Sequence, residues 1–198
     1  MNEEERQALR DSLRQARREL TPEQQSEAAQ SLYGLVAEQD FFANASQIAF
    51  YRGVDGEINP QLLLSKALAE GKSCYLPTIS AENVEQMAFA PFDKDTTLTE
   101  NEWGIGEPPV SEELVSPTSF DVVFVPLVGF DENCFRLGMG KGFYDRTFSF
   151  KIFNRRSRPL LVGLAHECQI TESFPTASWD VRLDAVITAE KIYRPDTA

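Results

Sequence analysis

Apolar residues recur at helical spacing in some segments of the chain and form short unbroken runs in others. Near the N-terminus, leucine or alanine returns every three or four residues, which is typical of a helix with one buried face. The next helix begins at Thr21, which suits the N-cap position, and Gln24 completes a capping box. Gly71 suits the C-terminal cap of a third helix. The predicted helices cover residues 3–20, 22–38, 59–71 and 142–150.

Short apolar runs elsewhere predict strands. The run DVVFVPLV at residues 121–128 is the most apolar of them, as expected of a central strand that is buried on both faces. Residues 93–119 are polar and rich in proline, glycine and glutamate, which predicts a long surface loop. The other predicted strands cover residues 47–51, 73–76, 87–90, 159–165 and 184–188.

The order of these elements indicates the fold class. Strands that alternate with helices are typical of an α/β fold, and we expect three layers, with a mostly parallel, Rossmann-like sheet flanked by helices. A chain of 198 residues is long enough for one such domain, which is predicted to cover residues 1–198. Nothing in the pattern fixes the order of the strands in the sheet.

Composition argues against several classes of protein. The formal net charge of −12 disfavours a general nucleic-acid binder, and the fourteen phenylalanines disfavour an acidic disordered chain. The three cysteines lie far apart, without the CxxC spacing of a zinc site, and suit reduced thiols in a cytosol. The N-terminus is charged, and no apolar run is long enough for a membrane helix. We therefore expect a cytoplasmic monomer that binds neither nucleic acid nor membranes.

The segment GFDENCFRLGMGKGFYDR, at residues 129–146, carries the clearest chemical signal. Glycines at positions 138, 140 and 142 let backbone N–H groups approach a phosphate, the following helix N-terminus favours negative charge, and Lys141 adds a cation. The loop is neither GxxxxGK[ST] nor GxGxxG, because Phe143 replaces the third glycine. By itself the loop predicts either a phosphate site or a tight strand–helix turn. It separates neither a nucleotide from a sugar phosphate nor an enzyme from a binder.

The longer string PLVGFDENCFRLGMGKGFYDR resembles the pattern of the 5-formyltetrahydrofolate cyclo-ligase family, also called methenyltetrahydrofolate synthetases. Further segments resemble the family in the right order: LTPEQ after an arginine-rich helix, YRGVDGEI followed by GKSCYLP, and WDVRLDAVIT near the C-terminus. Phe143 departs mildly from the pattern, since tyrosine is common there. The matching positions of the string are Pro126, Phe130, Asp131, Arg136, Leu137, Gly138, Gly140, Gly142, Phe143, Tyr144 and Asp145.

The resemblance implies an enzyme that uses ATP and Mg²⁺ to convert 5-formyltetrahydrofolate into 5,10-methenyltetrahydrofolate, with release of ADP and phosphate. ATP would phosphorylate the formyl oxygen, N10 would attack the activated carbon, and phosphate would leave. Such chemistry asks a protein mainly for positioning and charge neutralisation. The alternatives are a phosphosugar isomerase or CoA-transferase-like enzyme, which needs no ATP, and a folate- or nucleotide-binding module without turnover.

The same resemblance implies the site residues. Those implied for the reduced folate are Arg52, Glu57, Met139, Gly140, Lys141, Gly142 and Phe143. Those implied for Mg²⁺ are Asp145 and Asp180. Those implied for ATP are Arg6, Arg10, Arg136, Leu137, Gly138, Met139, Gly140, Lys141, Gly142, Phe143 and Tyr144.

Each acidic candidate also has an ordinary structural explanation. Asp145 suits a helix start, where a negative charge stabilises the macrodipole. Taken alone, Asp180 is typical of a surface turn and Glu57 of an exposed loop. Asp184, which lies near Asp180 in the sequence, is interpreted as a residue that starts a strand.

The remaining candidates leave alternatives open. A row of arginines at helical spacing is usually a solvated face, although in an acidic protein it also suits an ATP clamp. Trp103 either stacks on the pterin or anchors the long loop. His166, the only histidine, is expected to be structural. The row consists of Arg6, Arg10, Arg14 and Arg17, of which the last two receive no role, like the neighbouring Arg18.

Overall fold

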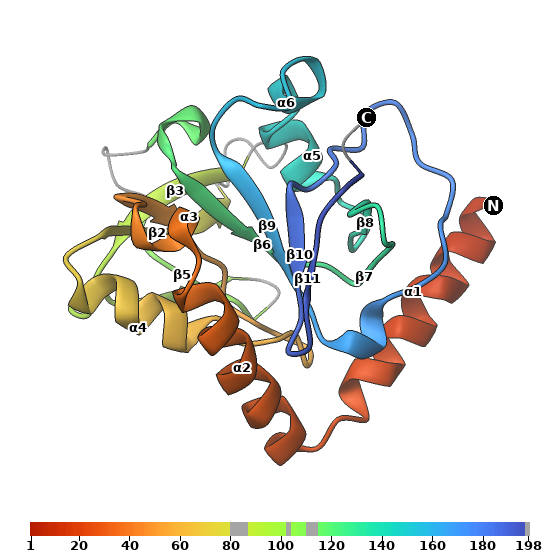
Figure 1. Ribbon diagram of the computed structural model, residues 1–198, viewed down its shortest axis with the longest axis horizontal. Coiled ribbons are helices and arrows are strands. Elements are labelled where there is room, and N and C mark those ends of the chain that lie inside the picture. The colour runs from red at the N-terminus through yellow and green to blue at the C-terminus, as the bar shows by residue number, and fades with distance from the viewer. Residues whose placement is uncertain (80–86, 102–103, 110–114, 197–198) are drawn as a thin grey trace.

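A seven-stranded sheet forms the centre of the protein, seen in a computed structural model that describes residues 1–79, 87–101, 104–109 and 115–196 (Figure 1). The sheet has the order β11-β10-β9-β6-β1-β2-β3. Its strands are β1 (Gln47–Ala49), β2 (Ser73–Ile79), β3 (Met87–Phe92), β6 (Val122–Val125), β9 (Leu160–Leu164), β10 (Ala185–Ile187) and β11 (Ile192–Tyr193). Two small hairpins pair β4 (Thr99–Glu100) with β5 (Gly106–Glu107), and β7 (Gly129–Phe130) with β8 (Arg136–Leu137). The helices are α1 (Glu3–Arg18), α2 (Pro22–Ala37), α3 (Asp40–Ala43), α4 (Gln61–Ala69), α5 (Phe143–Thr147) and α6 (Phe150–Phe153), with 3-10 turns η1 (Pro117–Ser119) and η2 (Glu167–Gln169).

The core of the sheet is parallel. β2, β1, β6, β9 and β10 pair in parallel, whereas β3 and β11 close the two edges in the antiparallel direction. Parallel sheets need cover on both faces, and the middle strand β6 is buried at all four positions, VVFV. Its run of β-branched and aromatic residues therefore suits its place at the centre.

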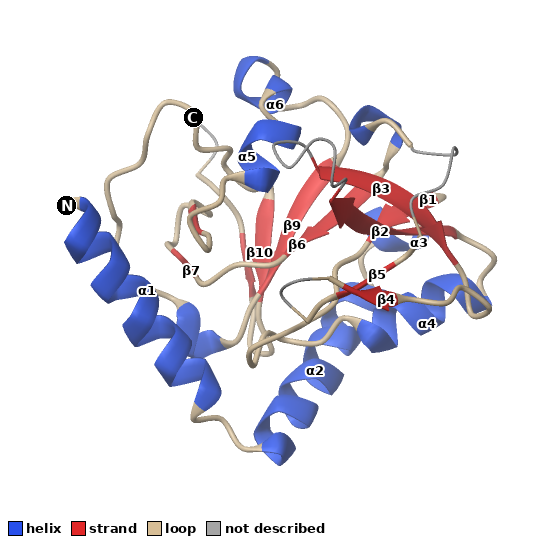
Figure 2. Cartoon of the chain, turned by 180° about the vertical axis from the view of Figure 1, so that it is seen from behind, coloured by secondary structure: helices blue, strands red, loops and turns tan. Residues whose placement is uncertain are grey.

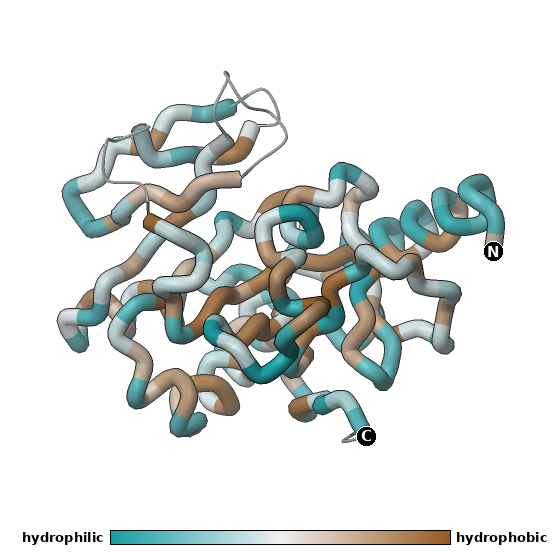
Figure 3. The backbone as a smooth tube through the Cα atoms, turned by 90° about the horizontal axis from the view of Figure 1, so that it is seen from above, coloured by the Kyte–Doolittle hydropathy of each residue, from teal (hydrophilic) through white to brown (hydrophobic). Residues whose placement is uncertain are grey.

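Alternate residues of the strands build two separate cores. On one face, Ile48, Phe124 and Val162 pack against α2, α3 and α4. On the other face, Val123 and Val125 pack with the buried Phe148 at the end of α5 and with the β7–β8 hairpin. Figure 2 shows the strands between these two groups of elements, and Figure 3 shows the apolar segments mainly in the middle of the molecule.

Helix α1 lies apart from the helices that cover the sheet. It runs past η2 and the β7–β8 side of the molecule (Figure 1), and its Leu13 joins a small core with Val128, Leu137 and Phe174. Both α1 and α2 begin with a capping box, made by Asn2 in α1 and by Thr21 in α2 as predicted. In the described part of the chain, no helix combines the length and the apolarity needed to cross a membrane.

The predicted fold class is confirmed, and so is the central place of the strand at residues 121–128, although that strand ends at Val125. The helix predicted over residues 142–150 is wrong in detail, because the chain leaves the helical conformation at Phe148 and restarts as α6. The surface loop predicted over residues 93–119 contains β4 and β5 among its described residues. The sequence pattern also missed α3, the β7–β8 hairpin and β11.

Candidate active site

The chain reverses direction across the sheet between β1 and β6. These parallel neighbours pair Ile48 with Val122, so the segments that follow their carboxyl ends leave the sheet at the same edge. From β1 the chain passes through α4 to β2, whereas from β6 it passes through α5 and α6 to β9, in the opposite direction along the sheet. The crevice beside such a reversal is the usual ligand site of an open α/β sheet. The segments that leave the sheet at this edge are residues 50–60 after β1 and 126–142 after β6.

The glycine loop lies between β8 and α5. Gly140 and Gly142 adopt φ angles of 89° and 66°, in the left-handed region that favours glycine. A Cβ on Gly142 would lie 2.9 Å from Nη1 of Arg146, which donates to the carbonyl of Lys141 at 2.8 Å. Met139 and Lys141 are exposed and therefore accessible to a ligand. Because α5 has only five residues, the loop N–H groups and the nearby cations, rather than a long helix, must supply any phosphate binding here.

Two arginines of the α1 row, Arg10 and Arg17, are buried. Arg10 is buried and donates from Nε to the carbonyl of Gly138 in the glycine loop at 3.1 Å. Arg17, also buried, contacts the loop that follows β1. The interpretation of the row as a solvated face is therefore wrong for both. Arg6 lies 3.5 Å from Oδ2 of Asp180, so α1 reaches from the C-terminal segment to the loop after β1.

Two carboxylates, Asp145 and Asp180, each lie beside an arginine. Asp145 of α5 forms an ion pair with Arg136 at 2.8 Å and accepts from the N–H of Val181 at 3.0 Å. Val181 directly follows Asp180, whose Oδ2 also accepts from the N–H of Ala177 at 2.8 Å. The described residues contain no cluster of three or more acidic, histidine or cysteine side chains suited to a metal. Two carboxylates nevertheless fit Mg²⁺, which usually takes one or two from the protein and completes its shell with phosphates and water.

Glu57 ends a tight turn in the loop after β1. Its N–H donates to the carbonyl of Val54 at 2.9 Å, and its Oε2 accepts from the N–H of Val54 at 3.2 Å. Burial raises the pKa of Glu57 to about 7, although Arg17 acts in the opposite direction. Glu57 interacts electrostatically with Tyr51 on its own segment and with Tyr144 of α5, and burial raises the pKa of both phenols. The predicted folate residue thus lies within electrostatic reach of Tyr144, in the helix that directly follows the glycine loop.

Other candidates are less directly placed. Arg52 is exposed, and no hydrogen bond or ion pair joins it to another part of the chain among the described residues. The Leu137 side chain is buried, which leaves only its backbone for a ligand. His166 is buried at the start of η2, where its ring accepts from the N–H of Gln169, in keeping with a structural role. Trp103 lies outside the described residues.

Sequence reasoning missed the partly buried charge network beside Glu57. Asp55 accepts from Arg14, Arg17 and Arg18, and Arg17 also lies 3.7 Å from Oε1 of Glu57. The signal available was weak: Arg17 follows Leu13 by four residues and therefore lies on the same side of α1 as this buried leucine.

Asp184 has a structural role. It accepts from the N–H of Leu161 at 2.8 Å and pairs with the buried Lys151 at 2.8 Å, which agrees with its interpretation as a residue that starts a strand.

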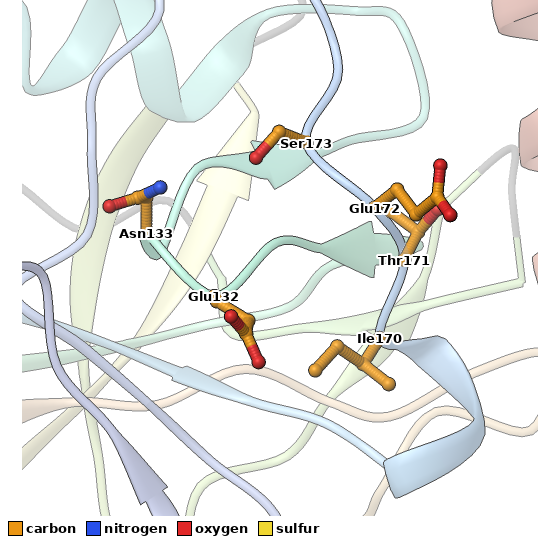
Figure 4. Close-up of a pocket in the computed structure, with 6 residues that line it drawn as sticks. All are labelled: Glu132, Asn133, Ile170, Thr171, Glu172 and Ser173. Carbon is orange, nitrogen blue, oxygen red and sulfur yellow. The ribbon is translucent and has the colours of Figure 1, made fainter.

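A separate pocket of about 470 Å³ lies at the turn of the β7–β8 hairpin. Figure 4 shows the side chains of Glu132 and Asn133 on the hairpin turn and of the segment that follows η2. Its charged side chains, Glu132 and Glu172, are both acidic, which does not suit a polyphosphate. No residue of the predicted site lines it. Its lining residues are Glu132, Asn133, Ile170, Thr171, Glu172 and Ser173.

Comparison with known proteins bears on this arrangement. The model of the 5-formyltetrahydrofolate cyclo-ligase family matches residues 2–189, which is nearly the whole chain. The chain belongs to this family. The 5-formyltetrahydrofolate cyclo-ligase of Haemophilus influenzae is 37% identical over 185 residues, covering 92% of this chain and 97% of that protein. That of Escherichia coli K12 is 37% identical over 182 residues, covering 91% and 98%.

The fold of the family is also the fold of this chain. The solved structure of the 5,10-methenyltetrahydrofolate synthetase of Aquifex aeolicus has a TM-score of 0.82 to it at 27% identity, covering 98% of this chain and 94% of that one. The resemblance drawn from the glycine-loop string is therefore confirmed, and with it the enzyme class, a cyclo-ligase. The relatives match over nearly their full length, so every segment that contributes to the crevice lies within the matched region.

Proposed function

We propose that this member of the cyclo-ligase family uses ATP and Mg²⁺ to convert 5-formyltetrahydrofolate into 5,10-methenyltetrahydrofolate, with release of ADP and phosphate. One observation carries the proposal: the segment with Glu57 follows β1, and the segment that leads through the β7–β8 hairpin to the glycine loop follows β6, the parallel neighbour of β1. Two ligands bound to these segments would meet in one crevice. Such proximity offsets several kcal/mol of the barrier of a reaction between them.

The ATP side of the crevice consists of the glycine loop and α1. The loop N–H groups and Lys141 would bind the phosphates, and the arginines that now pair with carboxylates would add positive charge. This local charge opposes the net charge of −12 that the chain carries as a whole. Arg10 contributes by fixing the loop through its bond to the Gly138 carbonyl. The proposed ATP residues remain those named from the sequence, with Leu137 restricted to its backbone.

The metal site consists of Asp145 and Asp180, on the same side of the crevice. Bound Mg²⁺ would neutralise charge that develops on the phosphates during transfer. Asp145 is held by the N–H of Val181, and Asp180 by the N–H of Ala177. Each carboxylate is therefore oriented by the backbone before any ligand arrives, at little further cost in side-chain entropy.

The folate side of the crevice consists of the loop after β1. The carboxylate of Glu57 would accept from adjacent N–H donors of the pterin. The glycine loop from Met139 to Phe143, which is exposed at residues 139–141, would face the same ligand. ATP would phosphorylate the formyl oxygen, which turns a poor leaving group into phosphate. N10 of the same folate would then attack the activated carbon, and phosphate would depart as the ring closes.

A spectrophotometric assay tests the proposal. The purified protein is mixed with Mg-ATP and 5-formyltetrahydrofolate, and formation of the methenyl product is followed by its absorbance near the edge of the visible range. Product is expected only when protein, ATP and folate are all present. No product with all three would refute the proposed function, and product without ATP would refute the role of the glycine loop as an ATP site.

A further inference from the structure

Arg17 is a buried arginine whose contacts join three segments of the chain. Its side-chain exposure is 0%. From α1 it donates to the carbonyl of Asp55 at 2.8 Å and to Oδ2 of the same residue at 3.1 Å. It also donates to the carbonyl of Leu127, in the segment after β6, at 3.2 Å. One side chain therefore joins α1 to the segment after β1 and to the segment after β6.

The guanidinium of Arg17 lies close to Glu57 without a hydrogen bond to it. Nη1 is 3.7 Å from Oε1 of Glu57, an ion-pair distance that is too long for a hydrogen bond. The N–H groups of Arg17 are engaged with Asp55 and Leu127 instead. Glu57 thus lies in the field of a buried cation, with its side chain 10% exposed and its Oε2 accepting from the N–H of Val54.

The turn that carries Glu57 is strained and is held by the same arginine. Asp55 has a φ angle of 54°, uncommon for a residue other than glycine, and Gly56 has a φ angle of 75°. A Cβ on Gly56 would lie 3.2 Å from the carbonyl oxygen of Arg17, so the backbone of the turn packs closely against α1. Strained backbone of this kind persists where the surroundings fix it, and it gathers at functional sites.

Burial of the charged Arg17 side chain costs free energy. Removing an arginine from water carries a desolvation penalty that packing with an apolar residue avoids. The charges that face Glu57 are Arg17 and Arg14 from α1 and Asp55 from its own turn, together with the titratable phenols of Tyr51 and Tyr144. Of these groups, Arg17 lies at ion-pair distance.

We propose that Arg17 is a positioning residue for folate binding, which fixes the carboxylate of Glu57 in the crevice through its bonds to Asp55 and Leu127 and holds it ready to accept from the pterin. This inference rests on the proposed function. Arg17 does not touch the folate; it acts through Glu57. Its removal should therefore weaken folate binding and leave ATP binding nearly unchanged.

A comparison of two single variants, Arg17→Lys and Arg18→Lys, tests the inference. Arg17→Lys keeps the charge but loses the fork that engages Asp55 and Leu127 together. Folate affinity, measured by isothermal titration calorimetry with 5-formyltetrahydrofolate, should fall about tenfold. That corresponds to the loss of one charge-assisted hydrogen bond between Glu57 and the pterin. ATP affinity should change less than about twofold. The matched control is Arg18→Lys, because Arg18 also binds Asp55 but is 47% exposed, and it should change folate affinity less than about twofold.

Coupling to Glu57 decides the role. If Arg17 acts through Glu57, the double variant Arg17→Lys with Glu57→Gln should bind folate as weakly as Glu57→Gln alone. Multiplied losses in the double variant, equal losses for ATP and folate, or an equal effect of Arg18→Lys would each overturn the inference. If Arg17→Lys does not fold, as judged by circular dichroism, Asp55→Asn is the second variant, because it removes one charge of the same network from the loop after β1. Asp55→Asn should weaken folate binding more than ATP binding. Unchanged folate affinity in this variant would overturn the inference. Absence of folate binding by the wild-type protein would instead overturn the proposed function, and this inference with it.

Discussion

Replacing Glu57 by glutamine tests the folate side of the crevice with little change in shape. The amide keeps one oxygen for the N–H of Val54 but replaces the other acceptor with a donor. A hydrogen bond to a charged group contributes about 1.5–3 kcal/mol, so folate affinity should fall about ten- to a hundredfold. ATP affinity should hardly change, because the proposed phosphate ligands lie on the glycine loop.

The pH dependence of the same variant adds a second signature. Since the pKa of Glu57 is about 7, this side chain is largely protonated in the free folded protein one unit below that pH. A protonated carboxyl no longer accepts with both oxygens, so folate affinity of the wild-type protein should rise from about pH 6 to about pH 8 and then level. In Glu57→Gln this rise should be absent.

The stability of the protein should show the opposite trend. Because the folded-state pKa of Glu57 is above the ordinary value of 4.5, ionising it costs more in the folded than in the unfolded chain. Its contribution is therefore most favourable below pH 4.5 and is lost as the pH rises to about 7, by about 3 kcal/mol at about 1.4 kcal/mol per unit. The free energy of unfolding of Glu57→Gln relative to that of the wild-type protein should consequently be higher at pH 8 than at pH 4.5.

Calorimetric titration of both ligands over this pH range, with denaturant unfolding at its two ends, checks the reasoning. Equal losses of folate and ATP affinity would mean that Glu57 is structural. Unchanged folate affinity would mean that Glu57, although its side chain is only 10% exposed, does not bind the pterin. A pH dependence that survives in the variant would assign the titration to another group.

Three further predictions concern other parts of the molecule. Lys141→Ala should sharply reduce ATP affinity and turnover, and it should not reduce stability because the side chain is exposed. The control Lys94→Ala, on another exposed turn, should leave ATP affinity and turnover unchanged. Wild-type kinetics in Lys141→Ala would remove Lys141 from the mechanism. Turnover should vanish in EDTA and return with Mg²⁺, and Asp145→Asn should raise the Mg²⁺ concentration needed; full turnover in metal-free buffer would contradict the proposed metal residues. Gly163→Ala places a methyl group 2.7 and 2.8 Å from two leucine methyl carbons and should lower the free energy of unfolding by about 1–3 kcal/mol, as measured with denaturant. Gly34→Ala in helix α2, where a Cβ would have nothing within 4 Å, should raise it by about 0.5–1 kcal/mol. The reverse order would refute the packing argument.

The sequence predicted best what depends on local pattern. The central strand VVFV and the capping box of α2 follow from an apolar run and from capping chemistry. The β7–β8 hairpin could not be predicted in this way, since strands of two residues are too short to show a period. Its turn is held instead by Asp131, whose carboxylate accepts from the N–H of Phe135 at 3.0 Å, and by Cys134 at a φ angle of 63°.

The site was predictable in its parts but not in its assembly. The glycine loop is visible as a motif, yet its meeting with Glu57 depends on β1 lying beside β6, and strand order is a long-range property. The role of Arg17 was hidden for a similar reason. Whether an arginine on a helix is buried or solvated depends on its partner, and Asp55 lies far away in the sequence.

The stoichiometry of a single reaction tests the central claim most directly, namely that ATP and the reduced folate react with each other in one crevice. Methenyl product is measured by absorbance, and ADP and phosphate are measured in samples of the same mixture. We expect one ADP and one phosphate for each methenyl group formed, with no ATP hydrolysis when folate is omitted. Methenyl formation without matching ADP, or ATP hydrolysis at an equal rate without folate, would contradict the account.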